Sequence, residues 1–196
     1  MISHTGQLLF SGGADGEIKI WDFQTGELRN TLTGHSSAIN ALITSRDGRW
    51  LISGDANGGV RSWDVSTGKE VQTFEGHTSP VNSLLVSLDG QRLISGAADG
   101  VIKVWNLTTA AELLSLKQHT AAINVLQLYD DGHTLLSGSA DKTIKVWELN
   151  TGDVLYTLAG FKTHVNEFVI APTNQIATNG ENGTIQLWQL PDPVDD

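Results

Sequence analysis

The sequence predicts an all-β fold built from repeated four-stranded antiparallel sheets, and three observations lead to it. Tryptophans recur 42, 42, 42 and 41 residues apart, at Trp21, Trp63, Trp105, Trp147 and Trp188. Before each tryptophan, apolar and polar residues alternate with the two-residue period of a half-buried strand. No segment of useful length has the period of an amphipathic helix, and the 21 glycines are spread along the whole chain, as short strands with tight turns require.

Each repeat carries the signals of four strands in order. An Asp-Gly type turn joins the first two strands, at Arg46–Gly48, Leu88–Gly90 and Asp130–Gly132. The second strand ends in an Ile-Ser-Gly type sequence and leads to a turn with Asp or Asn. The third strand ends at the tryptophan. A Thr-Gly turn then leads to the fourth strand, at Thr25–Gly26, Thr67–Gly68 and Thr151–Gly152. The unit is therefore an antiparallel meander of about 42 residues, the size of a propeller blade.

Residues 1–196 are interpreted as one domain with about 4.7 repeats. The repeats span roughly 1–33 (partial), 34–75, 76–117, 118–159 and 160–190, followed by a tail, 191–196. The first seven residues align with the end of a first strand, Ile43–Arg49. Pro191 and Pro193 closely follow Trp188 and cannot donate to a β-ladder, so the last repeat is expected to lack its outer strand. We expect an incomplete, open propeller, the C-terminal part of a larger one. A closed ring of five blades is the alternative.

The chain resembles the WD-repeat family of β-propellers over nearly its whole length. The resemblance rests on Gly-His pairs, turn acids or amides and Trp-Asp type pairs in one register: Gly34–His35, Asn57 and Trp63–Asp64, then Gly76–His77, Asp99 and Trp105–Asn106, with Trp21–Asp22 and Trp147–Glu148 flanking them. One such copy is weak evidence, whereas five copies in register are strong. The near-identical repeats suggest recent duplication, which is common in bacterial members of this family.

The resemblance implies a buried hydrogen-bond network in each blade. In the family, a loop His, a Ser or Thr of the second strand, the turn Asp and the Trp indole form this network. Two complete sets are expected here, and a third set has Asn in place of Asp: His77, Ser95, Asp99, Trp105; His119, Ser137, Asp141, Trp147; and His35, Ser53, Asn57, Trp63. A Ser-His-Asp catalytic triad is the competing interpretation. Because a catalytic site occurs once and this set recurs in each blade, the structural role is favoured.

The last repeat departs from this pattern. Phe161 stands where His is expected, and His164 follows three residues later. The network of this blade should be weaker unless His164 bends back to replace the missing ring. Four asparagines also share one place in the first strands, Asn40, Asn82, Asn124 and Asn166. They either satisfy backbone groups nearby, which is favoured, or line the mouth of the channel.

Composition limits the classes of partner. The net charge is −10 with only 12 scattered Lys and Arg, which argues against nucleic acid. The absence of cysteine excludes disulfides and thiolate metal sites. No signal peptide, membrane-spanning run, phosphate-binding loop, zinc-protease motif or calcium loop is visible. We expect a cytoplasmic protein that needs no metal or cofactor and binds neither nucleic acid nor membranes.

The predicted function is a noncatalytic scaffold for protein–protein interaction. The alternative is a regulatory or targeting segment of a multidomain signalling enzyme, linked to a kinase or protease that lies outside this chain. Residues that depart from the repeat are the candidates for partner binding: Asp55, Lys162, His164 and Glu181. Trp50, which lies off the repeat, is assigned to the core. Incomplete end blades could also support self-association.

Overall fold

The computed structural model describes residues 1–129, 132–171, 173, 175–179 and 184–190. Within that part of the chain, strands pair only with their neighbours in sequence and form five antiparallel sheets of three, four, four, four and three strands. In order the strands are β1 (Leu8–Gly12), β2 (Ile18–Asp22), β3 (Leu28–Leu32), β4 (Ile39–Thr44), β5 (Trp50–Asp55), β6 (Val60–Asp64), β7 (Glu70–Phe74), β8 (Val81–Val86), β9 (Arg92–Ala97), β10 (Ile102–Asn106), β11 (Glu112–Leu116), β12 (Ile123–Leu128), β13 (Thr134–Ser139), β14 (Thr143–Glu148), β15 (Val154–Ala159), β16 (Phe168–Ile170), β17 (Gln175–Asn179) and β18 (Ile185–Gln189).

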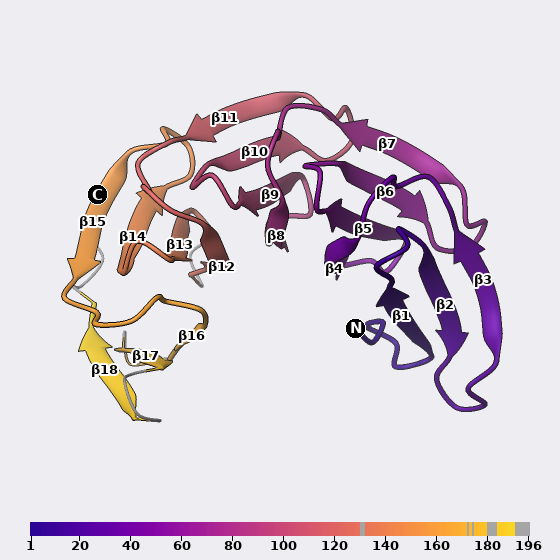
Figure 1. Cartoon of the computed structure of the whole chain (residues 1–196), viewed down its shortest axis with the longest axis horizontal. Helices are drawn as coiled ribbons and strands as arrows, with labels where there is room; N and C mark the ends of the chain where they lie inside the picture. Colours follow the sequence, from indigo (N-terminus) through magenta and orange to yellow (C-terminus); the bar gives the residue numbers. More distant parts are fainter. Residues whose placement is uncertain (130–131, 172, 174, 180–183, 191–196) are drawn as a thin grey trace.

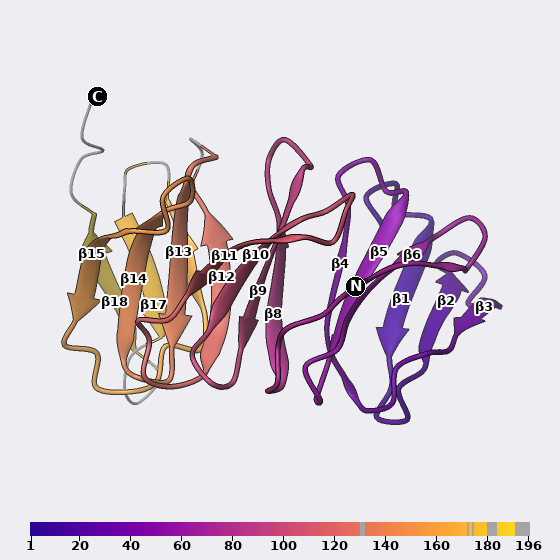
Figure 2. The same ribbon diagram turned by 90° about the horizontal axis from the view of Figure 1, so that it is seen from above.

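The sheets are arranged side by side in an open arc (Figure 1). Strands β4, β8 and β12 lie on the concave side, and β3, β7, β11 and β15 form the convex rim. Seen from above, the strands run across the thickness of the arc (Figure 2). The predicted all-β, incomplete propeller is thus confirmed. The alternative of a closed five-blade ring is wrong, because the first and last sheets lie at opposite ends of the arc.

The turns between the third and fourth strands show why glycine recurs there. Gly26, Gly68 and Gly152 have φ angles of 71°, 69° and 82°, a left-handed conformation that glycine adopts without steric cost. The same place in the third sheet holds Ala110, with φ of 58°. The repeated backbone therefore imposes the left-handed turn even where the residue disfavours it.

The core lies between sheets rather than at one centre. Four apolar clusters fill the four interfaces between neighbouring sheets, and Trp63, Trp105 and Trp147 are at most 1% exposed. The close approach depends on a glycine of the second strand that faces a β-branched residue of the next sheet. A Cβ atom built on each glycine would lie 2.4–2.7 Å from the opposite side chain, in the pairs Gly12–Ile39, Gly54–Val81, Gly96–Ile123 and Gly138–Val165. Each pair joins residues 27 positions apart, so every interface repeats the same contact.

The described residues contain no helix long and apolar enough to cross a membrane. Within the same residues, no group of three or more His, Cys, Asp or Glu side chains is arranged to hold a metal ion.

Candidate functional site

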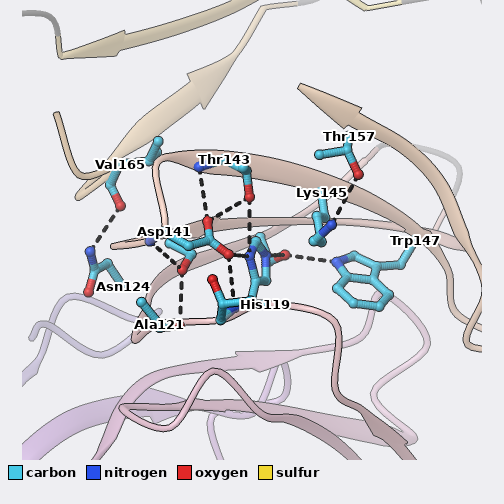
Figure 3. Close-up of polar contacts among 12 residues, drawn as sticks. His119, Ala121, Asn124, Asp141, Thr143, Lys145, Trp147, Thr157 and Val165 are labelled. Atoms are coloured by element: carbon cyan, nitrogen blue, oxygen red, sulfur yellow. Dashed lines mark hydrogen bonds and ion pairs between the residues drawn. The ribbon is translucent and has the colours of Figure 1, made fainter. Parts of the chain in front are cut away.

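The polar network of the fourth sheet connects four side chains (Figure 3). Trp147 Nε1 donates to Ser137 Oγ at 2.7 Å, and this hydroxyl lies 2.7 Å from His119 Nε2. His119 Nδ1 lies 2.7 Å from Asp141 Oδ2. Since the serine accepts from the indole, its own proton is available for Nε2. The remaining ring proton on Nδ1 then goes to the carboxylate, which defines a neutral His119 between a hydroxyl and an anion.

In the second sheet the carboxylate comes from a different backbone position than expected. His35 Nδ1 lies 2.7 Å from Asp55 Oδ2, while the Ser53 and Trp63 contacts match those of the fourth sheet. The assignment of Asn57 to this network is wrong, because Asn57 is exposed and Asp55 already holds the ring. The assignment of Asp55 to partner binding is contradicted as well, since only 3% of this residue is exposed.

Gly59 explains how a strand-end acid can take this role. A Cβ atom on Gly59 would lie 2.6 Å from Asp55 Oδ2, so glycine leaves the space that the carboxylate fills. The Gly59 and Asn57 amides both donate to Asp55 Oδ1, at 2.7 and 2.8 Å. In the fourth sheet the residue in place of Gly59 is Thr143, whose hydroxyl donates to Asp141 Oδ1 at 2.6 Å. The two blades therefore hold the histidine with two different acids.

The third sheet has neither arrangement. His77 Nε2 lies 2.7 Å from Ser95 Oγ, which accepts from Trp105 at 2.8 Å. His77 Nδ1, however, is buried without a hydrogen-bond partner among the described residues. Asp99, expected to complete this set, stays exposed and accepts from the Val101 amide at 3.0 Å. Val101 stands in place of Thr143 and has no hydroxyl to hold the carboxylate toward the ring, which accounts for the broken contact.

Burial governs the protonation of these histidines. It lowers the pKa of His77 to about 4, and the nearby Lys103 ammonium acts in the same direction. Burial also lowers the pKa of His35 and His119 and outweighs their hydrogen bonds to Asp55 and Asp141, which raise it. Burial raises the pKa of Asp55, but hydrogen bonds from His35 and backbone amides outweigh it, so the net shift is downward. At neutral pH the rings are therefore neutral and the carboxylates are ionised.

The geometry does not favour nucleophilic chemistry at these serines. Ser53, Ser95 and Ser137 are fully buried, and each hydroxyl is already engaged by an indole N–H and a histidine ring. A substrate carbonyl has no access to them, and the arrangement occurs in three successive sheets. We interpret the network as a support that ties the loop before each blade to its second and third strands.

The fifth sheet replaces the network by an aromatic contact. Phe161 packs on Trp188 with ring centroids 4.5 Å apart, and Trp188 Nε1 is buried without a partner among the described residues. Thr178 donates instead to the Glu167 carbonyl at 3.0 Å. His164 is exposed, so it does not bend back to replace the missing ring. Lys162 is exposed as well, whereas Glu181 lies outside the described residues.

Two of the four repeated asparagines connect neighbouring sheets. Asn82 Nδ2 donates to the Ile123 carbonyl at 3.2 Å, and Asn124 Nδ2 donates to the Val165 carbonyl at 3.0 Å (Figure 3). These two amides thus satisfy backbone groups, which is the role that the sequence favoured. The backbone groups belong to the next blade.

A surface pocket of about 280 Å³ lies at the opposite end of the blades from the histidine loops, between the second and third sheets. Its walls come from the β4–β5 turn, the β8–β9 turn and the β10–β11 turn: Ser45, Arg46, Asp47, Arg49, Trp50, Leu88, Asp89, Gly90, Leu107 and Thr108. Trp50 also packs against the core of this interface. Its assignment to the core is therefore incomplete, because one part of the ring faces the pocket.

The charges in this pocket differ in how firmly they are held. Asp47 Oδ1 accepts from Ser45 Oγ at 2.6 Å and from the Arg49 amide at 3.0 Å, and the serine hydrogen bond is the main cause of its lowered pKa. The guanidinium groups of Arg46 and Arg49 are exposed, and Arg49 makes one long ion pair, 3.7 Å from Asp64. The turn acids are thus bound to their own loops, while the two arginines extend into solvent beside an aromatic wall.

Five meander sheets joined by repeated apolar interfaces define this chain as a β-propeller protein. A family model described as the SPT8 beta propeller matches residues 1–187, and the chain belongs to that family.

The chain is also similar to two individual proteins, one by structure and one by sequence. The crystal structure of the computationally designed Ika8 protein superposes with a TM-score of 0.83 at 35% sequence identity, over 94% of this chain and 56% of that one. Autophagy-related protein 16 from Arabidopsis thaliana is 44% identical over 46 residues, which is 24% of this chain and 9% of the relative. The chain therefore spans less than a tenth of that curated relative and about half of the designed protein.

Proposed function

We propose that this chain is a noncatalytic scaffold of WD-repeat type that docks an extended peptide segment of a partner protein in the pocket between the second and third sheets. The observation that carries the proposal is the grouping of Arg46, Arg49 and Trp50 around one cavity. Arginine and tryptophan are the residue types that contribute most to binding at protein interfaces.

The chemistry of the pocket favours one kind of peptide. An acidic side chain would pair with the two guanidinium groups, which bind carboxylates with good geometry. An adjacent apolar side chain would pack on Trp50 and Leu88, and Leu88 is 38% exposed. Asp47 and Asp89 also line the pocket and balance the charge of the two arginines, so the pocket is formally neutral within a chain of charge −10. Because the two acids accept hydrogen bonds from their own turns, the arginines are the groups that remain for an acidic segment to pair with.

A displayed library of random peptides tests the proposal directly. We expect the wild-type chain to enrich peptides with an acidic residue next to an aromatic or aliphatic one. The Arg46→Glu/Arg49→Glu variant should lose that enrichment. Lys117→Glu/Lys142→Glu makes the same change in charge at the other end of the blades and should retain it. Equal enrichment by both variants would exclude this pocket as the docking site.

The alternative prediction is that the chain is a regulatory or targeting segment of an enzyme linked to a kinase or protease. Reading the DNA upstream of this coding sequence for further repeats and a catalytic domain tests it. Cytoplasmic location and bacterial origin also stay predictions. Lys162 and His164, both exposed, remain candidates for a second contact with a partner.

A further inference from the structure

The last sheet exposes apolar side chains whose counterparts in the preceding sheet are buried. In the strand register Ile185 pairs with Asn179 as Ile144 pairs with Gly138, so Ile185 and Leu187 occupy the places of Ile144 and Val146. The exposed fractions are 74% and 68% for Ile185 and Leu187, against 0% and 4% for their counterparts. Together with Val169, which is 57% exposed, these residues form what we call the β18 flank.

The first sheet carries the opposite half of the same interface. Leu9 pairs with Trp21 as Leu51 pairs with Trp63, and the latter two are buried against the sheet that precedes them. Leu9 and Trp21 are only partly buried. Beside them, Ile2 and Phe23 are each 49% exposed. We call Ile2, Leu9, Trp21 and Phe23 the β2 flank.

Asn179 indicates which kind of sheet can cover the β18 flank. It occupies the place of Gly12, Gly54, Gly96 and Gly138, where even a Cβ atom would collide with the β-branched residue of the following sheet. A four-stranded sheet with that residue on its first strand would therefore clash with the Asn179 side chain. The sheet β1–β2–β3 carries no strand in the place of β4 among the described residues, so it has room for an asparagine at this point.

We propose that a second copy of this chain covers the exposed flanks head to tail, with the β18 flank of one copy packed on the β2 flank of the other. Figure 1 places β1 and β2 at one end of the open arc and β18 at the other. The contact is therefore heterologous: it joins two different surfaces, and either two copies close into a ring or further copies extend the assembly. The internal interfaces between sheets provide the packing pattern that this contact repeats.

The mass of the purified 196-residue chain in solution is the first test. We expect light scattering and sedimentation to give at least twice the monomer mass of 21.1 kDa, with dissociation on dilution. A folded chain that stays monomeric at high concentration overturns the proposal.

Complementary variants identify the surfaces. Leu187→Glu blocks the β18 flank and Phe23→Glu blocks the β2 flank, so each variant alone should be monomeric. When the two are mixed, one intact flank of each kind remains, and a heterodimer should form. Leu113→Glu, which changes an exposed leucine on the outer strand β11, is the matched control and should associate like the wild type. Self-association of Phe23→Glu alone, or no heterodimer on mixing, overturns the head-to-tail contact.

Circular dichroism of each variant verifies folding, and Ile185→Lys replaces Leu187→Glu if the latter is unfolded. The Arg46→Glu/Arg49→Glu variant should still associate, because these arginines lie away from both flanks. Loss of peptide binding and loss of self-association can therefore be told apart.

Discussion

His35, His77 and His119 occupy the same place in three successive blades, yet their Nδ1 atoms have different surroundings. Asp55 reaches the first ring from the end of a strand, and Asp141 reaches the third from a turn. In the part of the chain that the structure describes, no acid contacts Nδ1 of the middle ring, His77. The local residue four positions after the strand end decides between these outcomes: glycine leaves space for one acid, threonine holds the other, and valine does neither.

Removing the charge of Asp55 should destabilise the second blade. Asp55→Asn weakens the bond to His35 and two bonds from backbone amides, and charge-assisted hydrogen bonds of this kind contribute about 1.5–3 kcal/mol. We expect a loss of about 2–3 kcal/mol in the free energy of unfolding, measured by urea denaturation. Asn57→Ala, at an exposed side chain two residues away, should change it by less than about 0.5 kcal/mol. Equal effects of both changes would contradict the assignment of Asp55 to the network.

The stability should also depend on pH through His77. Its folded-state pKa of about 4 lies below the ordinary value of 6.5, so the unfolded chain takes up a proton first as the pH falls. Its contribution is fully present above pH 6.5 and is lost between pH 6.5 and 4, a change of about 3 kcal/mol at 1.36 kcal/mol per unit. His77→Gln should flatten this part of the curve of unfolding free energy against pH. An unchanged slope would show that His77 is not buried in its neutral form.

At the scale of the element, the backbone conformation is conserved between the blades more strictly than the sequence is. The Thr-Gly turns and the alternation before each tryptophan predicted the strands and their order. Those signals are local, because they depend on residues a few positions apart. The turn of the third sheet keeps the left-handed conformation although Ala110 replaces glycine. The register of the flanking strands determines this turn.

Ala110→Gly should therefore stabilise the chain. A non-glycine residue in the left-handed region costs about 1–2 kcal/mol of folding free energy. Glycine removes this cost, but its greater conformational freedom in the unfolded chain offsets part of the gain. We expect a gain of about 1 kcal/mol, seen as a higher midpoint of thermal unfolding. Ala111→Gly next to it has no such strain to relieve and should lower the midpoint. A gain from both substitutions would mean that the turn is not strained at Ala110.

At the scale of the whole molecule, the sites that depend on neighbouring sheets could not be predicted from the sequence. Arg46 and Thr108 line one pocket although 62 positions separate them, and no motif connects them. Trp50 was visible as a residue off the repeat and was assigned to the core. Its grouping with Arg46 and Arg49 around one pocket depends on how the sheets are arranged. The sequence also did not show that Asp55, and not Asn57, binds His35. Both residues lie near the same turn, and only the folded structure shows which of them reaches the ring.

The last sheet should be less protected against amide hydrogen exchange than the third sheet. Among the residues that the structure describes, this sheet has three strands, the indole N–H of Trp188 has no hydrogen-bond partner, and the β18 flank is exposed. In dilute solution we expect amide hydrogens of β16–β18 to exchange faster than those of β8–β11, measured by mass spectrometry. Equal protection of the two sheets would show that the Phe161–Trp188 contact fully replaces the histidine network.

The glycine-to-β-branched contact between sheets also bears on how such a chain can change length. Every interface joins residues 27 positions apart, so it depends only on the repeat that follows. Gene recombination that adds or deletes whole repeats leaves each remaining contact intact, whereas the gain or loss of part of a repeat within a strand places side chains opposite the wrong partners. Unequal crossing-over between repeats therefore yields foldable arcs of different sizes in single steps, and the number of blades can vary faster than the blade itself.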